Sequence, residues 1–156
     1  MNHVSSARIL SVLLVFSLLS PISLAEIDPR LTASPMAQEA DVDDAAEYDI
    51  TVHNDGDDDM TVTLTTQQDA SNCNGFTSNI EQVSGSIDAG SSETVTLTVT
   101  VTDQADGDCE TTVNAQATPS GAPGTPKNAD ITVTTTSGDG GGLYAVKLTT
   151  DELTIE

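Results

Sequence analysis

Residues 94–102 alternate a threonine with an aliphatic residue at every position. In an extended chain successive side chains point to opposite faces, so one face of this segment carries only threonine and the other only valine and leucine. A helix would spread both kinds of residue around its surface. The segment therefore predicts a half-buried antiparallel strand with Val95, Leu97, Val99 and Val101 facing a core.

Shorter segments with the same alternation precede and follow this one, and turn residues separate them. Asn54, Asp55, Gly56 and Asp57 form the connection after the first of these segments, which we expect to be a hairpin turn. Several short alternating segments separated by turn residues indicate an all-β, immunoglobulin-like antiparallel sandwich of about seven strands. The apolar positions of the shorter segments are Tyr48, Ile50 and Val52; Met60, Val62 and Leu64; Val113, Ala115 and Ala117; and Ala129, Ile131 and Val133.

The composition argues in the opposite direction. Asp and Glu total 25 against four Lys and Arg, which gives a net charge of −21, and aromatic residues make up only 3%. Few large apolar residues together with a high net charge are typical of disordered chains. The strict alternation outweighs this warning, because a disordered segment has no reason to keep a two-residue period. The charge excludes nucleic acid and anionic membrane surfaces as partners, since both require clustered basic residues.

Residues 1–25 have the pattern of a cleaved signal peptide. A weakly basic start is followed by an apolar run over residues 9–19, and small residues precede a cleavage point after Ala25. The apolar run has 11 residues, whereas a membrane-spanning helix needs about 20. We therefore expect a secreted protein, extracellular or on the cell surface, without a transmembrane anchor in the mature chain.

Residues 48–57 and residues 87–99 resemble parts of CARDB-like domains, which are immunoglobulin-like modules of microbial cell-surface proteins. Residues 48–57, YDITVHNDGD, are similar to the first hairpin of that family, and residues 87–99, IDAGSSETVTLTV, are similar to its later turn and strand. The resemblance covers roughly residues 30–136. It implies a structural or adhesion module of the cell surface that occurs in tandem. One difference is Phe76, which stands where the family often has tryptophan.

Cys73 and Cys109 are the two cysteines of the chain. A secreted protein with two cysteines usually pairs them, and a metal site would lack further soft ligands. The alternation of the segment after Cys109 directs its sulfur inward, while Cys73 lies in a polar loop. We therefore expect a disulfide that fixes this loop to the sandwich and stabilises the fold by about 4 kcal/mol.

The residues give no support to an enzyme. His53 is the single histidine after residue 25, and its position in the alternation directs it to solvent, so a histidine-dependent triad or multi-histidine metal site lacks its components. The glycines of residues 138–142 are not followed by the Lys-Ser/Thr of a phosphate loop and indicate a flexible linker. We expect a non-enzymatic protein without a cofactor, and Ca²⁺ is the alternative to this expectation.

Calcium is the one chemical alternative that the residues suggest, because carboxylates cluster in the turns and Ca²⁺ takes six to eight oxygen ligands. None of the clusters matches the calcium loop D-x-[DN]-x-[DN]-G with a distant Glu, and a solvated acidic surface explains them as well. The candidate ligands are Asp55, Asp57, Asp58 and Asp59 in one turn, and Asp103, Asp106 and Asp108 in another, with a third acidic cluster at Asp41, Asp43 and Asp44.

The chain thus divides into a signal peptide (1–25), a sandwich (26–137), a glycine-rich linker (138–142) and a C-terminal strand (143–156). Residues 147–156 repeat the pattern of residues 30–39, so the last segment resembles the start of a second repeat. Other surface proteins or further copies of the chain are the expected partners. A second possibility for the last strand is donation to a neighbouring subunit in an extracellular filament.

Overall fold

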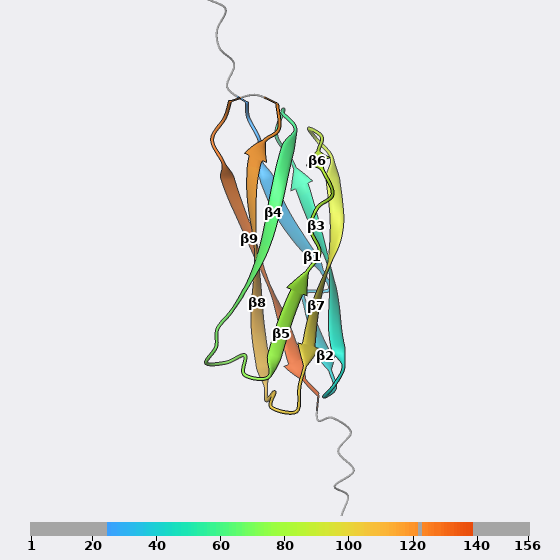
Figure 1. Cartoon of the computed structure of the whole chain (residues 1–156). Helices are drawn as coiled ribbons and strands as arrows, with labels where there is room; N and C mark the ends of the chain where they lie inside the picture. The colour runs from blue at the N-terminus through green and yellow to red at the C-terminus, as the bar shows by residue number, and fades with distance from the viewer. Residues whose placement is uncertain (1–24, 122, 139–156) are drawn as a thin grey trace, which may run out of the picture.

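The computed structural model describes residues 25–121 and 123–138, which form two β-sheets packed face to face (Figure 1). The predicted signal peptide up to residue 24, most of the predicted linker and the C-terminal strand lie outside these residues. The strands are β1 (Pro29–Ser34), β2 (Ala37–Ala40), β3 (Ala45–Asn54), β4 (Met60–Gln68), β5 (Phe76–Ile80), β6 (Ser86–Ile87), β7 (Ser92–Val101), β8 (Asp108–Pro119) and β9 (Lys127–Ser137).

One sheet has four strands in the order β1-β3-β7-β5, and the other has five in the order β2-β9-β8-β4-β6. All neighbouring strands are antiparallel except β2 and β9, which are parallel. The described residues contain no helix of the length and apolarity that a membrane crossing requires. This architecture confirms the predicted all-β, immunoglobulin-like sandwich.

The core lies where the alternation predicted it. In β7, Val95, Leu97, Val99 and Val101 are all buried, and the intervening threonines face outward. The same pattern buries one face of β3, β4 and β8, whereas β9 is only partly buried over its first half. Most of the side chains between the sheets are therefore small and aliphatic.

The expected hairpin after Asn54 is wrong. β3 pairs with β1 and β7 in the four-stranded sheet, whereas β4 pairs with β6 and β8 in the five-stranded sheet. The chain therefore crosses from one sheet to the other at residues 55–59. Alternation gives the buried face of each strand but not its neighbour, so two strands joined by a short turn can belong to different sheets.

The N-terminal strand also changes sheet. β1 pairs with β3 over six residues, and after the bend at Pro35 and Met36 the chain continues as β2, which pairs with β9 over four residues. This division, together with the short β6, accounts for nine strands where about seven were expected. A single run of chain consequently belongs to both sheets.

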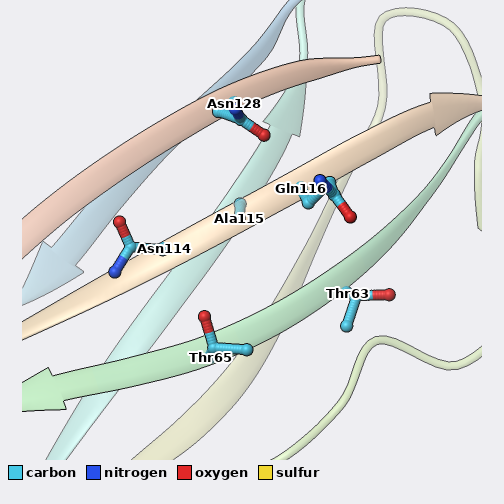
Figure 2. Close-up of a pocket in the computed structure, with 6 residues that line it drawn as sticks. All are labelled: Thr63, Thr65, Asn114, Ala115, Gln116 and Asn128. Carbon is cyan, nitrogen blue, oxygen red and sulfur yellow. The ribbon is translucent and has the colours of Figure 1, made fainter.

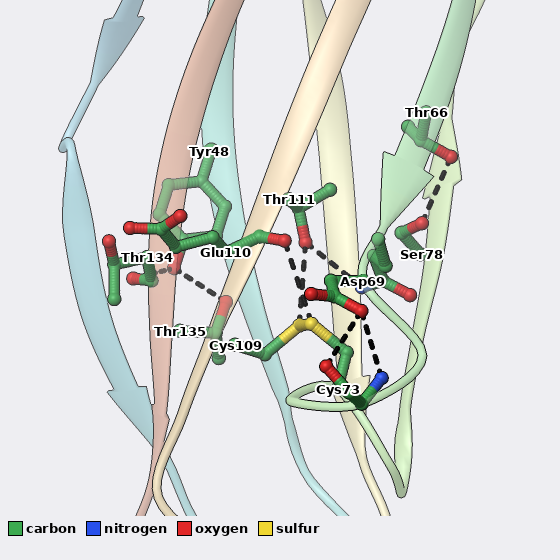
Figure 3. Close-up of a disulfide and its surroundings, with 12 residues drawn as sticks. Tyr48, Thr66, Asp69, Cys73, Ser78, Cys109, Glu110, Thr111, Thr134 and Thr135 are labelled. Carbon is green, nitrogen blue, oxygen red and sulfur yellow. Dashed lines mark hydrogen bonds between the residues drawn. A yellow bond between two sulfur atoms is a disulfide. The ribbon is translucent and has the colours of Figure 1, made fainter.

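Tyr48 connects the two sheets through the core (Figure 3). The ring is fully buried on β3, and its hydroxyl donates to the backbone carbonyl of Thr134 on β9 at 2.7 Å. The hydroxyl of Thr135, also buried, lies 2.8 Å from the Tyr48 hydroxyl oxygen. Because the Tyr48 proton is donated to Thr134, Thr135 is the donor in this second bond. Burial raises the pKa of the Tyr48 phenol above its ordinary value, so the group stays protonated and keeps its donor role.

Gln82 protects an open edge of the five-stranded sheet. β6 covers only Met60 and Thr61 of β4, so the later residues of β4 pair with β8 on one side and have no neighbouring strand on the side of β6. The Gln82 side-chain amide accepts a hydrogen bond from Leu64 N at 3.0 Å and donates one to Leu64 O at 3.0 Å. One side chain thus replaces a strand at this point, which reduces the tendency of the edge to pair with other chains.

We expect Tyr48→Phe to lower the free energy of unfolding by about 1–2 kcal/mol, because it leaves the buried Thr135 hydroxyl without its partner. Urea unfolding followed by circular dichroism measures the change. Thr94→Val removes an exposed hydroxyl and serves as the control, with an expected effect within about 0.5 kcal/mol. Equal effects of the two substitutions would show that the Tyr48 hydroxyl does not stabilise the contact between the sheets.

Candidate functional site

The predicted disulfide between Cys73 and Cys109 is present, with an S–S distance of 2.03 Å and a Cα–Cα distance of 4.8 Å (Figure 3). Cys109 is the second residue of β8 and is fully buried, as its place in the alternation predicted. Cys73 lies in the loop between β4 and β5, where its N–H donates to the carbonyl of Asp69 at 2.8 Å. The bridge joins a loop that leads into one sheet to a central strand of the other.

The first acidic turn binds the N-terminal segment of the chain. The backbone N–H of Glu26 donates to Asp58 Oδ2 at 2.7 Å, and Asp57 N donates to the Glu26 carbonyl at 2.9 Å. Gly56 permits this contact, because a Cβ at that position would lie 2.5 Å from the Glu26 carbonyl oxygen and 2.7 Å from Ile27 Cα. Ile27 is fully buried beside the turn. The Asp58 carboxylate and the backbone of Asp57 thus fix the beginning of the sandwich.

The two other acids of this turn are also engaged. Asp55 accepts hydrogen bonds from the Arg30 guanidinium at 2.6 and 3.3 Å, and Asp59 Oδ1 accepts one from Ala89 N at 3.0 Å. The Arg30 hydrogen bond holds the pKa of the Asp55 carboxyl below its ordinary value. The pair therefore favours folding above the ordinary carboxyl pKa, and this contribution is lost as the pH falls through the lowered pKa. Its solvent exposure limits the contribution.

Asn54 organises the same end of the sandwich. Its fully buried side chain donates to the carbonyls of Asp58 at 2.8 Å and Ile87 at 3.1 Å, and its Oδ1 accepts from Gly56 N at 3.2 Å. Its backbone groups bond Gly90 and Ser91. The residue thereby connects β3, the crossing turn, β6 and the start of β7.

Asn54 was expected only as part of a hairpin turn, and its buried, bridging role was not predicted. The signal that could have revealed it is the alternation itself. Asn54 has the same parity as Ile50 and Val52, so β3 directs it into the core, where a polar side chain needs hydrogen-bond partners. Among the described residues, every buried side-chain nitrogen and oxygen has such a partner.

The second acidic turn lies at the opposite end of the sandwich, between β7 and β8 (Figure 1). Asp108 accepts a hydrogen bond from the Thr136 hydroxyl at 2.7 Å, and Asp106 lies with it in a shallow groove that also contains Asn72 and Gln104. Asp103 is exposed in the same turn but does not line this groove. The two predicted groups of calcium ligands are therefore separated by the length of the sandwich.

No three acidic, histidine or cysteine side chains within residues 25–121 and 123–138 are grouped so that they could hold a metal ion. Four of the predicted calcium ligands accept hydrogen bonds from the chain, namely Asp55, Asp58, Asp59 and Asp108. Asp69 in the disulfide loop is a further example, because bonds from the backbone and hydroxyl of Ser71 lower the pKa of its carboxyl. His53 lies on the outer side of β3, 3.1 Å from the Thr32 hydroxyl of β1.

A shallow groove crosses the outer face of the five-stranded sheet (Figure 2). It has a volume of about 310 Å³, and hydroxyl and amide groups supply its polar side chains. None of the lining residues is charged, although the chain as a whole carries −21. Thr63 and Thr65 come from β4, Asn114, Ala115 and Gln116 from β8, and Asn128 from β9.

No protein-family model matches the chain. No curated protein matches it either. Among solved structures, it is similar to the ASH/PapD-like domain of human CEP192 (PapD-like domain 7), with 13% sequence identity, coverage of 88% of this chain and 95% of that chain, and a TM-score of 0.48. Similarity at this level of identity concerns the fold alone.

We expect Asn54→Asp to lower the free energy of unfolding by at least about 2 kcal/mol, because a carboxylate would face the two carbonyls that now accept from the amide. Asn79→Asp on the exposed edge strand β5 introduces the same charge and is the matched control, with an expected effect within about 0.5 kcal/mol. Urea unfolding at neutral pH measures both. A similar loss for the two variants would mean that added charge, rather than the loss of Asn54 contacts, determines stability.

We expect Ca²⁺ and Mg²⁺ at equal millimolar concentration to raise the melting temperature by equal amounts. Both ions screen the repulsion between carboxylates, and the dispersed acidic turns offer neither of them a specific site. Differential scanning calorimetry in the two salts measures the shifts. A larger shift with Ca²⁺ that disappears in Asp57→Asn or Asp106→Asn would instead locate a calcium site in the corresponding turn.

Proposed function

We propose that this protein is a secreted, non-enzymatic structural and adhesion module of the cell surface or extracellular space. The observation that carries the proposal is the position of the chain ends. Glu26 is bound to the turn between β3 and β4, and Gly138 donates to the Ala40 carbonyl at 2.8 Å at the far end of β9. The first and last described residues thus lie at opposite ends of the sandwich (Figure 1).

This geometry suits a spacer. A domain whose chain enters at one end and leaves at the other adds its full length to a row of domains, whereas adjacent ends would fold the row back on itself. Gly138 was assigned to the linker from the sequence, but it is buried and bonded to Ala40, so the sandwich includes it. The resemblance to CARDB-like domains supports the same function, because such modules occur in tandem.

The disulfide supports an extracellular location, since such bonds form and persist in oxidising compartments. It also suits a protein that has left the cell. A covalent connection between the sheets limits unfolding outside the cell, where chaperones do not refold the chain. The signal-peptide pattern of residues 1–25 points to the same compartment.

The uncharged groove is the surface that we assign to adhesion. Two copies of a chain with a charge of −21 repel each other, and an acidic partner would be repelled as well. The hydroxyl and amide side chains around Asn114 and Gln116 offer donors and acceptors without that repulsion. Partners are other surface proteins or further copies of the chain.

We expect the chain to be exported with cleavage after Ala25 and with its disulfide formed. Expression in a secreting host, N-terminal sequencing and mass measurement with and without a thiol reagent test this. A matched variant with Leu13→Asp and Leu14→Asp in the apolar run should stay inside the cell, because the charges interrupt the signal. A wild-type chain found inside the cell, uncleaved and with two free thiols, would contradict the proposed location.

A further inference from the structure

We propose that this domain carries tension between its two ends, and that the parallel pair of β2 and β9 is the element that resists it. The proposal rests on the proposed function only for the source of the tension, which would be the neighbours on either side. The mechanical property itself follows from the strand directions of residues 25–138 and can be measured separately.

The N-terminal run is the segment of residues 26–40, which contains β1 and β2. Tension pulls this run and β9 in opposite directions along their common axis. β1 and β2 lead from the N-terminal end of the sandwich toward the other end, and β9 runs the same way and leaves there (Figure 1). A force on Glu26 therefore draws β1 and β2 back, while a force on Gly138 draws β9 forward. Because β2 and β9 are neighbours, the force shears one past the other.

Shear loads all hydrogen bonds of the pair together. The bonds lie across the strands, so sliding one strand along the other must stretch them simultaneously, whereas pulling a strand away from its end breaks them one after another. Thr134 N donates to the Met36 carbonyl at 3.0 Å at one end of the pair, and Gly138 N donates to the Ala40 carbonyl at 2.8 Å at the other. Both ends of the β2–β9 pair are thus fixed.

The same run is held by the other sheet as well. β1 pairs over six residues with β3, and the Arg30 side chain bonds Asp55. Residues before β1 add the contacts of Glu26 and Ile27 with the crossing turn. Withdrawal of the N-terminal run therefore requires release from both sheets.

The disulfide limits the length that a failed domain releases. Cys73 and Cys109 are separated by 36 residues, and the chain between them contains β5, β6 and β7. Tension passes through the sulfur bridge and does not reach this loop while the bridge is intact. Reduction should add about 130 Å to the extension on unfolding, from 36 residues at about 3.6 Å each.

Single-molecule force spectroscopy on the mature chain tests the proposal by comparing two directions of pulling. In the first, the handles are joined to the backbone before Glu26 and after Gly138, because a side chain at Gly138 itself would lie 2.5 Å from Asp41 Oδ1. In the second, the C-terminal handle is moved to Gly121, an exposed position in the turn after β8 at the same end as Glu26, where an added side chain meets no atom within 4 Å. We expect at least about twofold higher unfolding force in the first direction, because only that direction shears β2 against β9.

A set of edge-strand variants separates the pair from the rest of the fold. Gln38→Pro removes a backbone donor from β2, and Asn79→Pro removes one from β5, outside the path of the force. Gln38→Ala keeps the donor and removes only the side-chain bond to the Glu47 carbonyl. We expect Gln38→Pro alone to lower the end-to-end unfolding force toward the value of the second direction.

Thermal unfolding of each variant establishes that it is folded before it is pulled. Equal unfolding forces in the two directions for the unsubstituted chain would overturn the proposal whatever the variants do. An equal loss of force in Gln38→Pro and Asn79→Pro would overturn the assignment to β2 and β9. Neither result would bear on secretion, so failure here and failure of the proposed location are distinguishable.

Discussion

The two sheets meet through side chains that are mostly small and aliphatic, and this constraint determines much of the rest of the structure. Tyr48 and Phe76 are the aromatic residues of the described chain, and the remaining core is largely valine, isoleucine, leucine and alanine. Burial of such side chains gives about 25 cal/mol for each Å² of apolar surface, so a core of small residues stabilises the fold less than one rich in aromatics. Specific connections between the sheets compensate for this.

These connections are spread along the sandwich. Asn54 joins strands of both sheets at the N-terminal end, the disulfide joins a loop to β8 toward the other end, and Tyr48 bonds β9 from β3. The N-terminal run adds a further connection, because β1 and β2 belong to different sheets. The carboxylates of the acidic turns contribute as acceptors for backbone N–H groups. Several carboxylates that are candidate metal ligands in the sequence therefore stabilise turns in the structure.

The sequence was sufficient to predict the class of fold and the buried faces, because both depend on local alternation. The disulfide was predictable for another reason, since the chain has two cysteines and a signal-peptide pattern. A two-residue period identifies the inner face of a strand, and the parity of Cys109 directs its sulfur inward. Sheet membership was not accessible in the same way, since alternation is identical for a strand in either sheet. The crossing after Asn54 was therefore mistaken for a hairpin.

The candidate site was less predictable than the fold. The acidic turns at residues 55–59 and 103–108 could form one site only if they occupied the same end of the sandwich. Which end each turn occupies follows only from the three-dimensional arrangement. The groove around Asn114 and Gln116 combines residues of three strands, so no continuous segment of the sequence marks it. Gln82 likewise gains its role from the strand that it happens to cover.

The dependence of this sandwich on connections between its sheets is tested most directly by its stability without the disulfide. Urea unfolding of residues 26–156 and of the same segment with Cys73→Ala and Cys109→Ala gives the two free energies under identical conditions. We expect the variant to be less stable by about 4 kcal/mol, the value for a closed loop of this length. A difference below about 0.5 kcal/mol would show that the core of small side chains holds the sheets together without the bridge.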